Sequence, residues 1–295
     1  MACLQTYVSC VAHLHHKAKF LNEDNPPVAM CLVPATFYGL VLWSEMVFAG
    51  EIPVLPRPKV YGDRLSKRVL DPRYRLVNKR IVLYHNFFRT RVDPPASDML
   101  EMTWHSGAAD DAQRWADSCQ LLTHDNATGR WVDEYGSCGQ NIFVSNVKVP
   151  WFFAIKIWFL EHHNFSFGDQ RNNIPSRVGH YTQMVWYSSH KLGCGFQYCG
   201  RNVTKKPYYN YVCNYCPIGN YPERFGQPYT KGKPCAKCPG HCRSKRLCTN
   251  PCEHADFWVN CREIAQHWRH WLCSNPKAER YKACRATCGC HERIR

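Results

Sequence analysis

Cysteine content constrains this chain more than any other feature. The sequence has 19 cysteines, and 16 of them lie from residue 119 onward. Pairs such as Cys213/Cys216 and Cys235/Cys238 have the spacing of zinc ligands, but the other cysteines do not continue that pattern. An even set can close into disulfides, which form and persist outside the cytosol. The sequence therefore predicts a cross-linked protein that folds in an oxidising compartment.

The first 50 residues have the character of a leader. An apolar run at residues 31–43 precedes the sequence VFAG at 47–50, in the order of a signal-peptide h-region and a small-residue cleavage site. Translation could start at Met30, directly before the run. A buried helix or a membrane anchor is the alternative, but the run is shorter than the roughly 20 residues that span a bilayer. We therefore predict a secreted, extracellular protein that is not a transmembrane protein.

Charge and composition indicate the kind of partner. Hydrophobic residues make up 45% of the chain and charged residues 21%, which is typical of a globular protein. The net charge is +15, and outside the cell this favours acidic glycans, membrane surfaces or acidic channel vestibules over nucleic acid. A generally basic, soluble surface would explain the charge equally well. Candidate glycosylation sequons begin at Asn126, Asn164 and Asn202.

Hydrophobic periodicity predicts the main elements. Residues 51–73 contain four prolines and no period, so we expect an extended N-terminal segment. Apolar periods predict helices at residues 74–91, 106–119 and 149–165, and aromatic runs predict an antiparallel strand pair at 193–199 and 208–213. The residues expected to face inward are Leu76, Ile81, Leu83, Tyr84, Phe87 and Phe88 in the first helix, and Ala108, Ala112, Trp115, Ala116 and Cys119 in the second.

The composition changes near Tyr229. The last 67 residues contain 10 cysteines and 14 lysines or arginines against 5 acidic residues, with few aliphatic side chains. Such a segment cannot bury enough apolar surface to build a large core, so disulfides must hold it. We therefore expect a separate, cross-linked tail.

Several motifs resemble those of one family. The sequences GHYTQMVW at residues 179–186 and YVCNYCPIGN at 211–220 resemble the two signatures of the CAP superfamily, supported by residues 85–86, 112–116 and 138–142. The tail sequences PYTKGKPCAKCP, LCTNPC and CRATCGC, which begin at residues 228, 247 and 284, are similar to the hinge and ion-channel-regulator modules of cysteine-rich secretory proteins.

The resemblance implies an architecture and a disulfide pairing. It implies an α+β fold, with a three-layer α/β/α sandwich CAP domain at residues 74–225, a cysteine-rich hinge at 226–250 and a small ShK-like helical module at 251–295. The implied disulfides are Cys119–Cys199, Cys138–Cys216, Cys194–Cys213, Cys235–Cys242, Cys238–Cys248, Cys252–Cys290, Cys261–Cys284 and Cys273–Cys288.

The resemblance also implies a cleft that can hold a divalent metal such as zinc. The matching residues are His124, His180, Gln140 and Glu161. Gln140 replaces a carboxylate and His124 is shifted by one residue, so we expect weak metal binding at most and no required cofactor. His180 as a hydrogen-bonded core histidine and Glu161 as a capping or helix-surface carboxylate are the structural alternatives. Neither Ser188, Ser189 nor Thr182 has the spacing of a catalytic triad, so we name no catalytic residue.

The tail carries the candidate partner-binding residues. Aromatic rings lie among cations there, which suits docking onto a membrane protein such as an ion channel, although two of the rings could instead form a small core. The residues are Phe257, Trp258, Trp268, Arg269 and Trp271. The leading hypothesis is a secreted, non-enzymatic binding protein. Alternatives are a lipid or sterol carrier using residues 151–159, a reproductive-tract interaction protein, and a metal-dependent hydrolase.

Overall fold

The computed structural model describes residues 60–295, so the predicted signal peptide and most of the predicted extended segment lie outside the described residues. The remainder of that segment forms two short 3₁₀ turns, η2 (Gly62–Arg64) and η3 (Lys67–Val69). Leu65 and Leu70 are buried in the main core, and the Trp151 indole donates to the Leu70 carbonyl at 2.7 Å. The predicted domain start at residue 74 is therefore too late, because apolar side chains before it already pack inward.

A four-stranded sheet forms the middle of the body, in the order β1-β5-β6-β4. The strands are β1 (Thr103–Trp104), β4 (Gly139–Ser145), β5 (Lys191–Cys199) and β6 (Tyr208–Cys216). Strands β5 and β6 are antiparallel, as predicted, and β4 pairs antiparallel with the other edge of β6. Strand β1 is parallel to β5.

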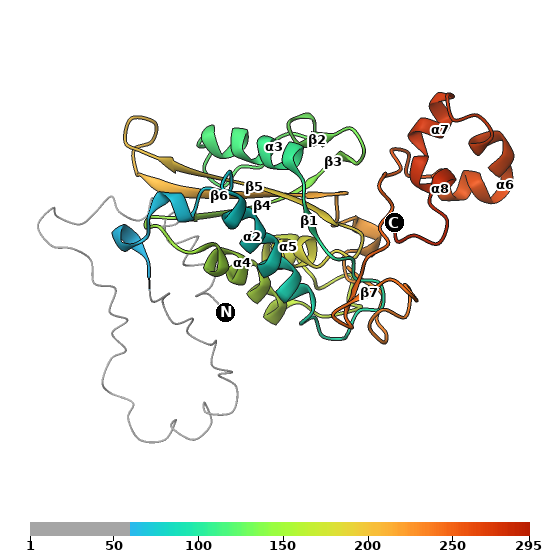
Figure 1. Ribbon diagram of the computed structural model, residues 1–295, viewed down its shortest axis with the longest axis horizontal. Coiled ribbons are helices and arrows are strands. Elements are labelled where there is room, and N and C mark those ends of the chain that lie inside the picture. Colours follow the sequence, from blue (N-terminus) through green and yellow to red (C-terminus); the bar gives the residue numbers. More distant parts are fainter. Residues whose placement is uncertain (1–59) are drawn as a thin grey trace, which may run out of the picture. The chain divides into compact units, whose positions relative to one another are not determined.

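Helix α3 (Ser106–Asp117) covers one face of this sheet (Figure 1). Its predicted alanine face is buried, and β5 presents glycine opposite it. A Cβ at Gly193 would lie 2.1 Å from the Ala109 nitrogen, and one at Gly195 would lie 2.4 Å from Cα of Gln113. Small residues on both elements therefore allow the helix backbone to lie directly on the strand.

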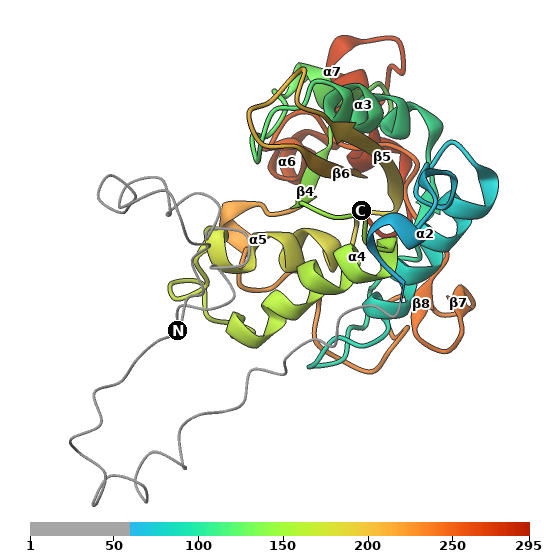
Figure 2. The same cartoon turned by 90° about the vertical axis from the view of Figure 1, so that its left-hand side faces the viewer.

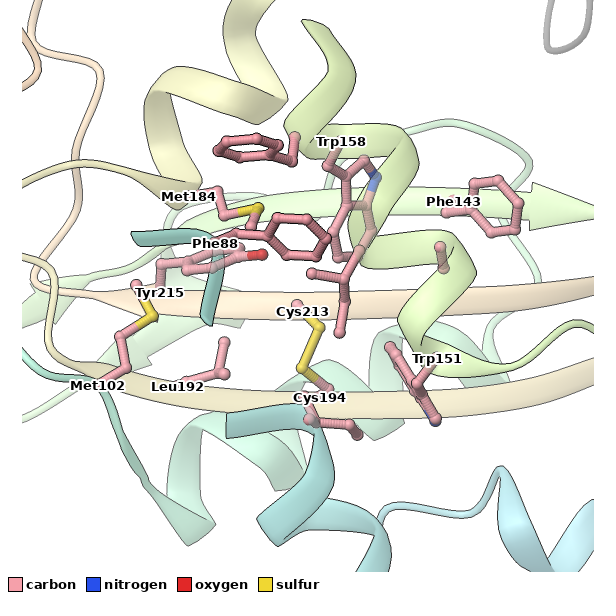
Figure 3. Packing of buried hydrophobic residues seen from close by; sticks show 14 of the residues in the cluster. Phe88, Met102, Phe143, Trp151, Trp158, Met184, Leu192, Cys194, Cys213 and Tyr215 are labelled. Atoms are coloured by element: carbon pink, nitrogen blue, oxygen red, sulfur yellow. A yellow bond between two sulfur atoms is a disulfide. The ribbon is translucent and has the colours of Figure 1, made fainter. Parts of the chain in front are cut away.

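Three helices cover the opposite face: α2 (Arg75–Arg89), α4 (Trp151–Leu160) and α5 (Pro175–Met184). Figure 2 shows them across the sheet from α3, which gives the α/β/α sandwich. Figure 3 shows the core between them, where Phe88, Trp158 and Met184 meet above the Cys194–Cys213 disulfide of the sheet. The buried face of α2 differs from the prediction: Leu76, Leu83 and Phe87 are exposed, and the buried residues are Val77, Ile81, His85, Phe88 and Arg89.

Shorter elements complete the body and form the tail. The turn η4 (Thr128–Arg130) precedes a hairpin of β2 (Trp131–Val132) and β3 (Gly136–Ser137), while η5 (Glu161–Asn164) follows α4 and η6 (Pro222–Arg224) ends the body. The hinge contains β7 (Cys242–Arg243) and β8 (Leu247–Cys248). The tail module consists of α6 (Cys261–Cys273), α7 (Glu279–Ala283) and α8 (Arg285–Gly289).

Eight disulfides cross-link the described residues, three in the body, two in the hinge and three in the tail module. They join the eight pairs that the family resemblance implies. The tail module buries few side chains besides its own cysteines: its core cluster is Cys261, Leu272, Cys284 and Cys288. Covalent links therefore replace apolar packing there.

Side-chain contacts also tie the tail to the body. The carboxylate of Glu253 accepts a hydrogen bond from the Tyr135 hydroxyl at 2.8 Å and lies 3.0 Å from Nζ of Lys191. The nearby side chains of His190, Lys191 and Tyr135 together hold the pKa of Glu253 well below its usual range. The ring of Phe257 packs against Trp131, with centroids 5.3 Å apart. Within residues 60–295, no helix has the length and apolar character needed to cross a membrane.

Candidate functional site

The four residues that the resemblance assigns to the metal site come from four different segments. His124 follows α3, Gln140 lies on β4, Glu161 begins η5 and His180 lies on α5. The structure joins them in two pairs, each made of one histidine and one oxygen-bearing side chain. Asn141, next to Gln140 on β4, donates to the backbone carbonyl of His180 at 3.0 Å and so joins the segments that carry the two pairs.

His180 is held by Glu161. Its Nδ1 lies 2.6 Å from Oε1 of Glu161, and the other carboxylate oxygen accepts from the backbone N–H groups of His180 and Tyr181 at 2.9 and 3.0 Å. The Trp158 ring stacks on the imidazole, with centroids 6.3 Å apart. Because a carboxylate only accepts, Nδ1 carries the proton and the lone pair of the neutral ring is on Nε2. Glu161 thus orients the His180 ring and also accepts hydrogen bonds from two backbone N–H groups.

His124 is held in the same way by Gln140. Its Nδ1 lies 3.1 Å from Oε1 of Gln140, which also accepts from the Asp125 backbone at 3.1 Å. The Gln140 amide nitrogen donates to Asn214 at 3.0 Å. Burial lowers the pKa of His124, and the nearby His180 adds to this, while the bond to Gln140 opposes it. The neutral tautomer with its lone pair on Nε2 is therefore favoured here too.

The donor set does not fit a closed zinc site. Structural zinc takes four ligands, and catalytic zinc takes three from the protein. The pairs supply two imidazole nitrogens, because Gln140 and Glu161 already use their oxygens to accept hydrogen bonds. In the described part of the chain, only Cys235, Cys238 and Cys248 bring three ligand atoms together. Their sulfurs are in disulfides, so they offer no thiolate.

Replacing Gln140 with glutamate is expected to raise zinc affinity at least about tenfold, because a carboxylate that accepts from a ligand histidine increases its basicity. Isothermal titration of the secreted chain with zinc measures this. Gln140→Glu together with His180→Ala is the control and should lose the gain. Equal affinities of Gln140→Glu and the unchanged chain would contradict the assignment of His124 and His180 as ligands.

The serine and threonine hydroxyls near His180 have structural partners. Ser189 donates to the Pro217 carbonyl at 2.7 Å, and Thr182 donates to the Val178 carbonyl at 3.1 Å. Among residues 60–295, no hydrogen bond joins a serine or threonine hydroxyl to a histidine ring nitrogen. These hydroxyls are therefore not arranged as serine or threonine nucleophiles activated by a histidine.

The aromatic stretch at residues 151–159 belongs mainly to the core. Trp151, Trp158 and Phe159 are buried in the main cluster, and Phe152 packs on Phe88 with ring centroids 5.5 Å apart. This stretch is the predicted lipid or sterol groove; three of its rings are used in core packing, and Phe152 remains 38% exposed. Asn126, Asn164 and Asn202 are exposed, so burial does not prevent their glycosylation.

The tail aromatics lie outside the small core. Trp268 and Trp271 are 64% and 53% exposed, and Phe257 and Trp258 are also exposed. The alternative in which two of these rings build the core is wrong, because cystine sulfur and Leu272 fill that place. Phe257 differs from the others in packing against Trp131 of the body.

Two arginines lie next to the two most exposed tryptophans, Arg269 in the sequence and Arg280 in space. Arg269 is exposed between them, and the guanidinium of Arg280 lies 5.0 Å from the centre of the Trp271 ring. Trp268 has non-helical backbone angles, φ −134° and ψ 39°, which bend α6 at that residue. We call Trp268, Arg269 and Trp271 the tail patch. It combines rigid aromatic area with positive charge, the composition of energetically dominant interface residues.

Arg89 is an important residue that the sequence pattern missed. It is buried at the end of α2, and its guanidinium donates only to backbone carbonyls. A charged residue beside two phenylalanines at a helix end gave no signal that it points inward. The sequence shows only that Arg89 lies one turn after His85, on the same side of the helix, and the structure buries both side chains.

Comparisons with known proteins agree with this architecture. The family model described as "Cysteine-rich secretory protein family" matches residues 82–215, and the one described as "Crisp" matches residues 235–295. Cysteine-rich secretory protein 3 of Equus caballus is 47% identical over 62% of this chain and 73% of its own length. Cysteine-rich secretory protein 2 of Homo sapiens is 36% identical over 90% of this chain and 100% of its own length.

A search of solved structures found "Crystal structure of NaASP2 with Zn2+", at 28% identity and a TM-score of 0.49, over 60% of this chain and 96% of that one. The assignment depends on the sequence relatives, whose similarity extends through both the sandwich and the disulfide-rich tail. The chain therefore belongs to the cysteine-rich secretory protein family, with a CAP domain followed by a cysteine-rich C-terminal region.

Proposed function

We propose that this protein is a secreted, non-enzymatic ligand of a cell-surface membrane protein, foremost an ion channel, and that the tail patch makes the contact. The observation that carries the proposal is the exclusion of Trp268 and Trp271 from the small core. A disulfide-rich module holds these rings rigidly, so little side-chain freedom is lost when they bind. The cations beside them complement the acidic vestibule of a cation channel.

The body supports the tail in this proposal. The sandwich has a large core, and the contacts of Glu253 and Phe257 fix the start of the tail module against it. The paired histidines supply two nitrogen ligands and no activated nucleophile, which supports a binding role over hydrolysis. Secretion is supported by the eight disulfides and by the secretory family to which the chain belongs.

Patch-clamp recording tests the proposal. Purified secreted chain is applied to cells that carry calcium, potassium or cyclic-nucleotide-gated currents, and we expect reduction of at least one current at micromolar concentration. Trp268→Ala with Trp271→Ala should weaken the effect at least about tenfold, since exposed aromatic anchors dominate binding energy.

Leu121→Ala with Val203→Ala is the matched control, because both side chains are exposed and apolar but lie on the body. This variant should retain full potency. Absence of an effect on all three currents removes the channel from the proposal. Equal loss of potency in the two variants would remove the tail patch as the contact.

A further inference from the structure

One face of α2 is apolar and positively charged, and it points away from the core. Leu76, Arg80, Leu83 and Phe87 follow each other at intervals of four, three and four residues, which places them along one side of a helix. Leu76 and Leu83 are 60% and 62% exposed. We call these four residues the α2 ridge. Figure 2 shows α2 as an outer helix of the body.

Charge on this helix has one sign. The sequence of α2, RLVNKRIVLYHNFFR, contains no acidic residue, and Arg75, Lys79 and Arg80 are all exposed. No carboxylate within residues 60–295 forms an ion pair with any of these three cations. Within the part of the chain that the structure describes, these cations are therefore available to an external anion.

Further cations lie on the aromatic rings at both ends of the helix. The guanidinium of Arg91 is 3.4 Å from the centre of the Phe87 ring, and that of Arg68 is 5.0 Å from the Tyr74 ring. Aromatic side chains with a cation above them combine an apolar body with a charged tip. Such groups suit the boundary between lipid headgroups and acyl chains.

The composition favours a lipid surface over a protein partner. A stable protein interface buries about 800 Å² on each side, and its centre is depleted of lysine. On the α2 ridge, the apolar side chains instead lie directly beside exposed cations, and one of these cations is Lys79. Amphipathic helices that lie in a membrane interface have this pattern of leucine or phenylalanine flanked by lysine and arginine.

We propose that the α2 ridge is a membrane-docking face, which places Leu76, Leu83 and Phe87 among the headgroups of anionic phospholipids while the flanking cations contact lipid phosphates and carboxylates. Each cation near such a surface adds attraction, and the inserted apolar side chains add area removed from water. This binding does not use the tail patch, so it is tested independently of the proposed channel contact.

Co-sedimentation of the purified secreted chain with vesicles tests the proposal. We expect binding to vesicles of phosphatidylcholine with phosphatidylserine, and at least about tenfold weaker binding to phosphatidylcholine alone. Lys79→Glu with Arg80→Glu should weaken binding to the anionic vesicles at least about tenfold. Leu76→Gln with Leu83→Gln should weaken it several-fold at unchanged charge. Both pairs are exposed, so circular dichroism should show an unchanged fold.

Two matched controls separate this face from charge spread over the molecule. Lys205→Glu with Lys206→Glu makes the same charge change on the exposed β5–β6 loop and should weaken binding less than about twofold. Trp268→Ala with Trp271→Ala should bind the vesicles like the unchanged chain. Equal losses in the Lys79/Arg80 and Lys205/Lys206 variants would overturn the proposal. Unaltered binding by the leucine variant, or loss through the tail variant alone, would also overturn it.

Discussion

Replacing Arg89 with alanine is expected to prevent accumulation of folded, secreted protein. Arg89 is buried, and its guanidinium donates to four backbone carbonyls from two other parts of the chain. It contacts Leu100 O twice, at 2.9 and 2.8 Å, and contacts Met184 O and Trp186 O at 2.9 Å and Tyr187 O at 3.2 Å. The side chain thus joins the end of α2 to the segment before β1 and to the turn after α5.

The expected loss is large because alanine satisfies none of these acceptors. An unsatisfied buried polar group costs about 1–3 kcal/mol, and the deleted side chain leaves a cavity as well. We expect a decrease of at least about 4 kcal/mol in the free energy of unfolding, against a total of about 5–15 kcal/mol for a typical domain. Burial lowers the pKa of Arg89 to about 9, so the group remains charged at neutral pH.

Urea unfolding and the yield of secreted protein measure this effect. Arg89→Lys keeps the charge but has three donors on one nitrogen, so it should lie between the alanine variant and the unchanged chain. Arg75→Ala, an exposed arginine of the same helix, should change the free energy of unfolding by less than about 0.5 kcal/mol. An Arg89→Ala chain that unfolds at the same urea concentration as the unchanged chain would show that the four carbonyls find other donors.

Periodicity located α2 and correctly placed Ile81 and Phe88 inward, but it assigned only part of the buried face. Counting apolar residues placed Leu76 and Leu83 inward, whereas the helix buries the polar residues His85 and Arg89. His85 bonds to the Ile81 carbonyl and to the Tyr215 hydroxyl, 130 residues away, and burial lowers its pKa to about 4. A buried polar residue depends on partners brought by the tertiary fold, and one sequence does not reveal them.

The strands and the small-residue helix were predictable for a physical reason. Aromatic, β-prone runs on both sides of a polar turn became β5 and β6, and the alanine face of α3 lies on the glycines of β5. These features depend on the local order of residue types and on side-chain volume, and the sequence gives both directly. The resemblance named the four residues of the histidine pairs, but it could not show that Glu161 and Gln140 use their oxygens to orient His180 and His124.

The tail shows the same limit. Its composition indicated that it has few apolar side chains. The core cluster of the tail, which consists of cystine sulfur and Leu272, agrees with this. Which rings remain outside depends on the three-dimensional path that the disulfides impose. That path follows from the cysteine pairing, and the pairing came from the resemblance because spacing alone allows many connectivities.

Removing the Cys252–Cys290 disulfide is expected to unfold the tail module while the body stays folded. This bond joins the two ends of the module across a sequence separation of 38 residues. Closing a loop of this size contributes about 4 kcal/mol through the entropy of the unfolded chain. A core as small as that of the tail rarely supplies more than about 3–5 kcal/mol, so the expected loss is comparable with the whole stability of the module.

Limited trypsin digestion of a Cys252→Ser, Cys290→Ser chain, followed by mass spectrometry, measures this. The expected result is rapid cleavage at the many lysines and arginines of the tail, with the body recovered as a resistant fragment. Cys194→Ala with Cys213→Ala is the control, because that bond closes a separation of only 19 residues between strands that are already paired. Its removal should leave the tail resistant. If the tail of the Cys252→Ser, Cys290→Ser chain resisted trypsin equally well, apolar packing would hold the module, and the rigid display of Trp268 and Trp271 would need another cause.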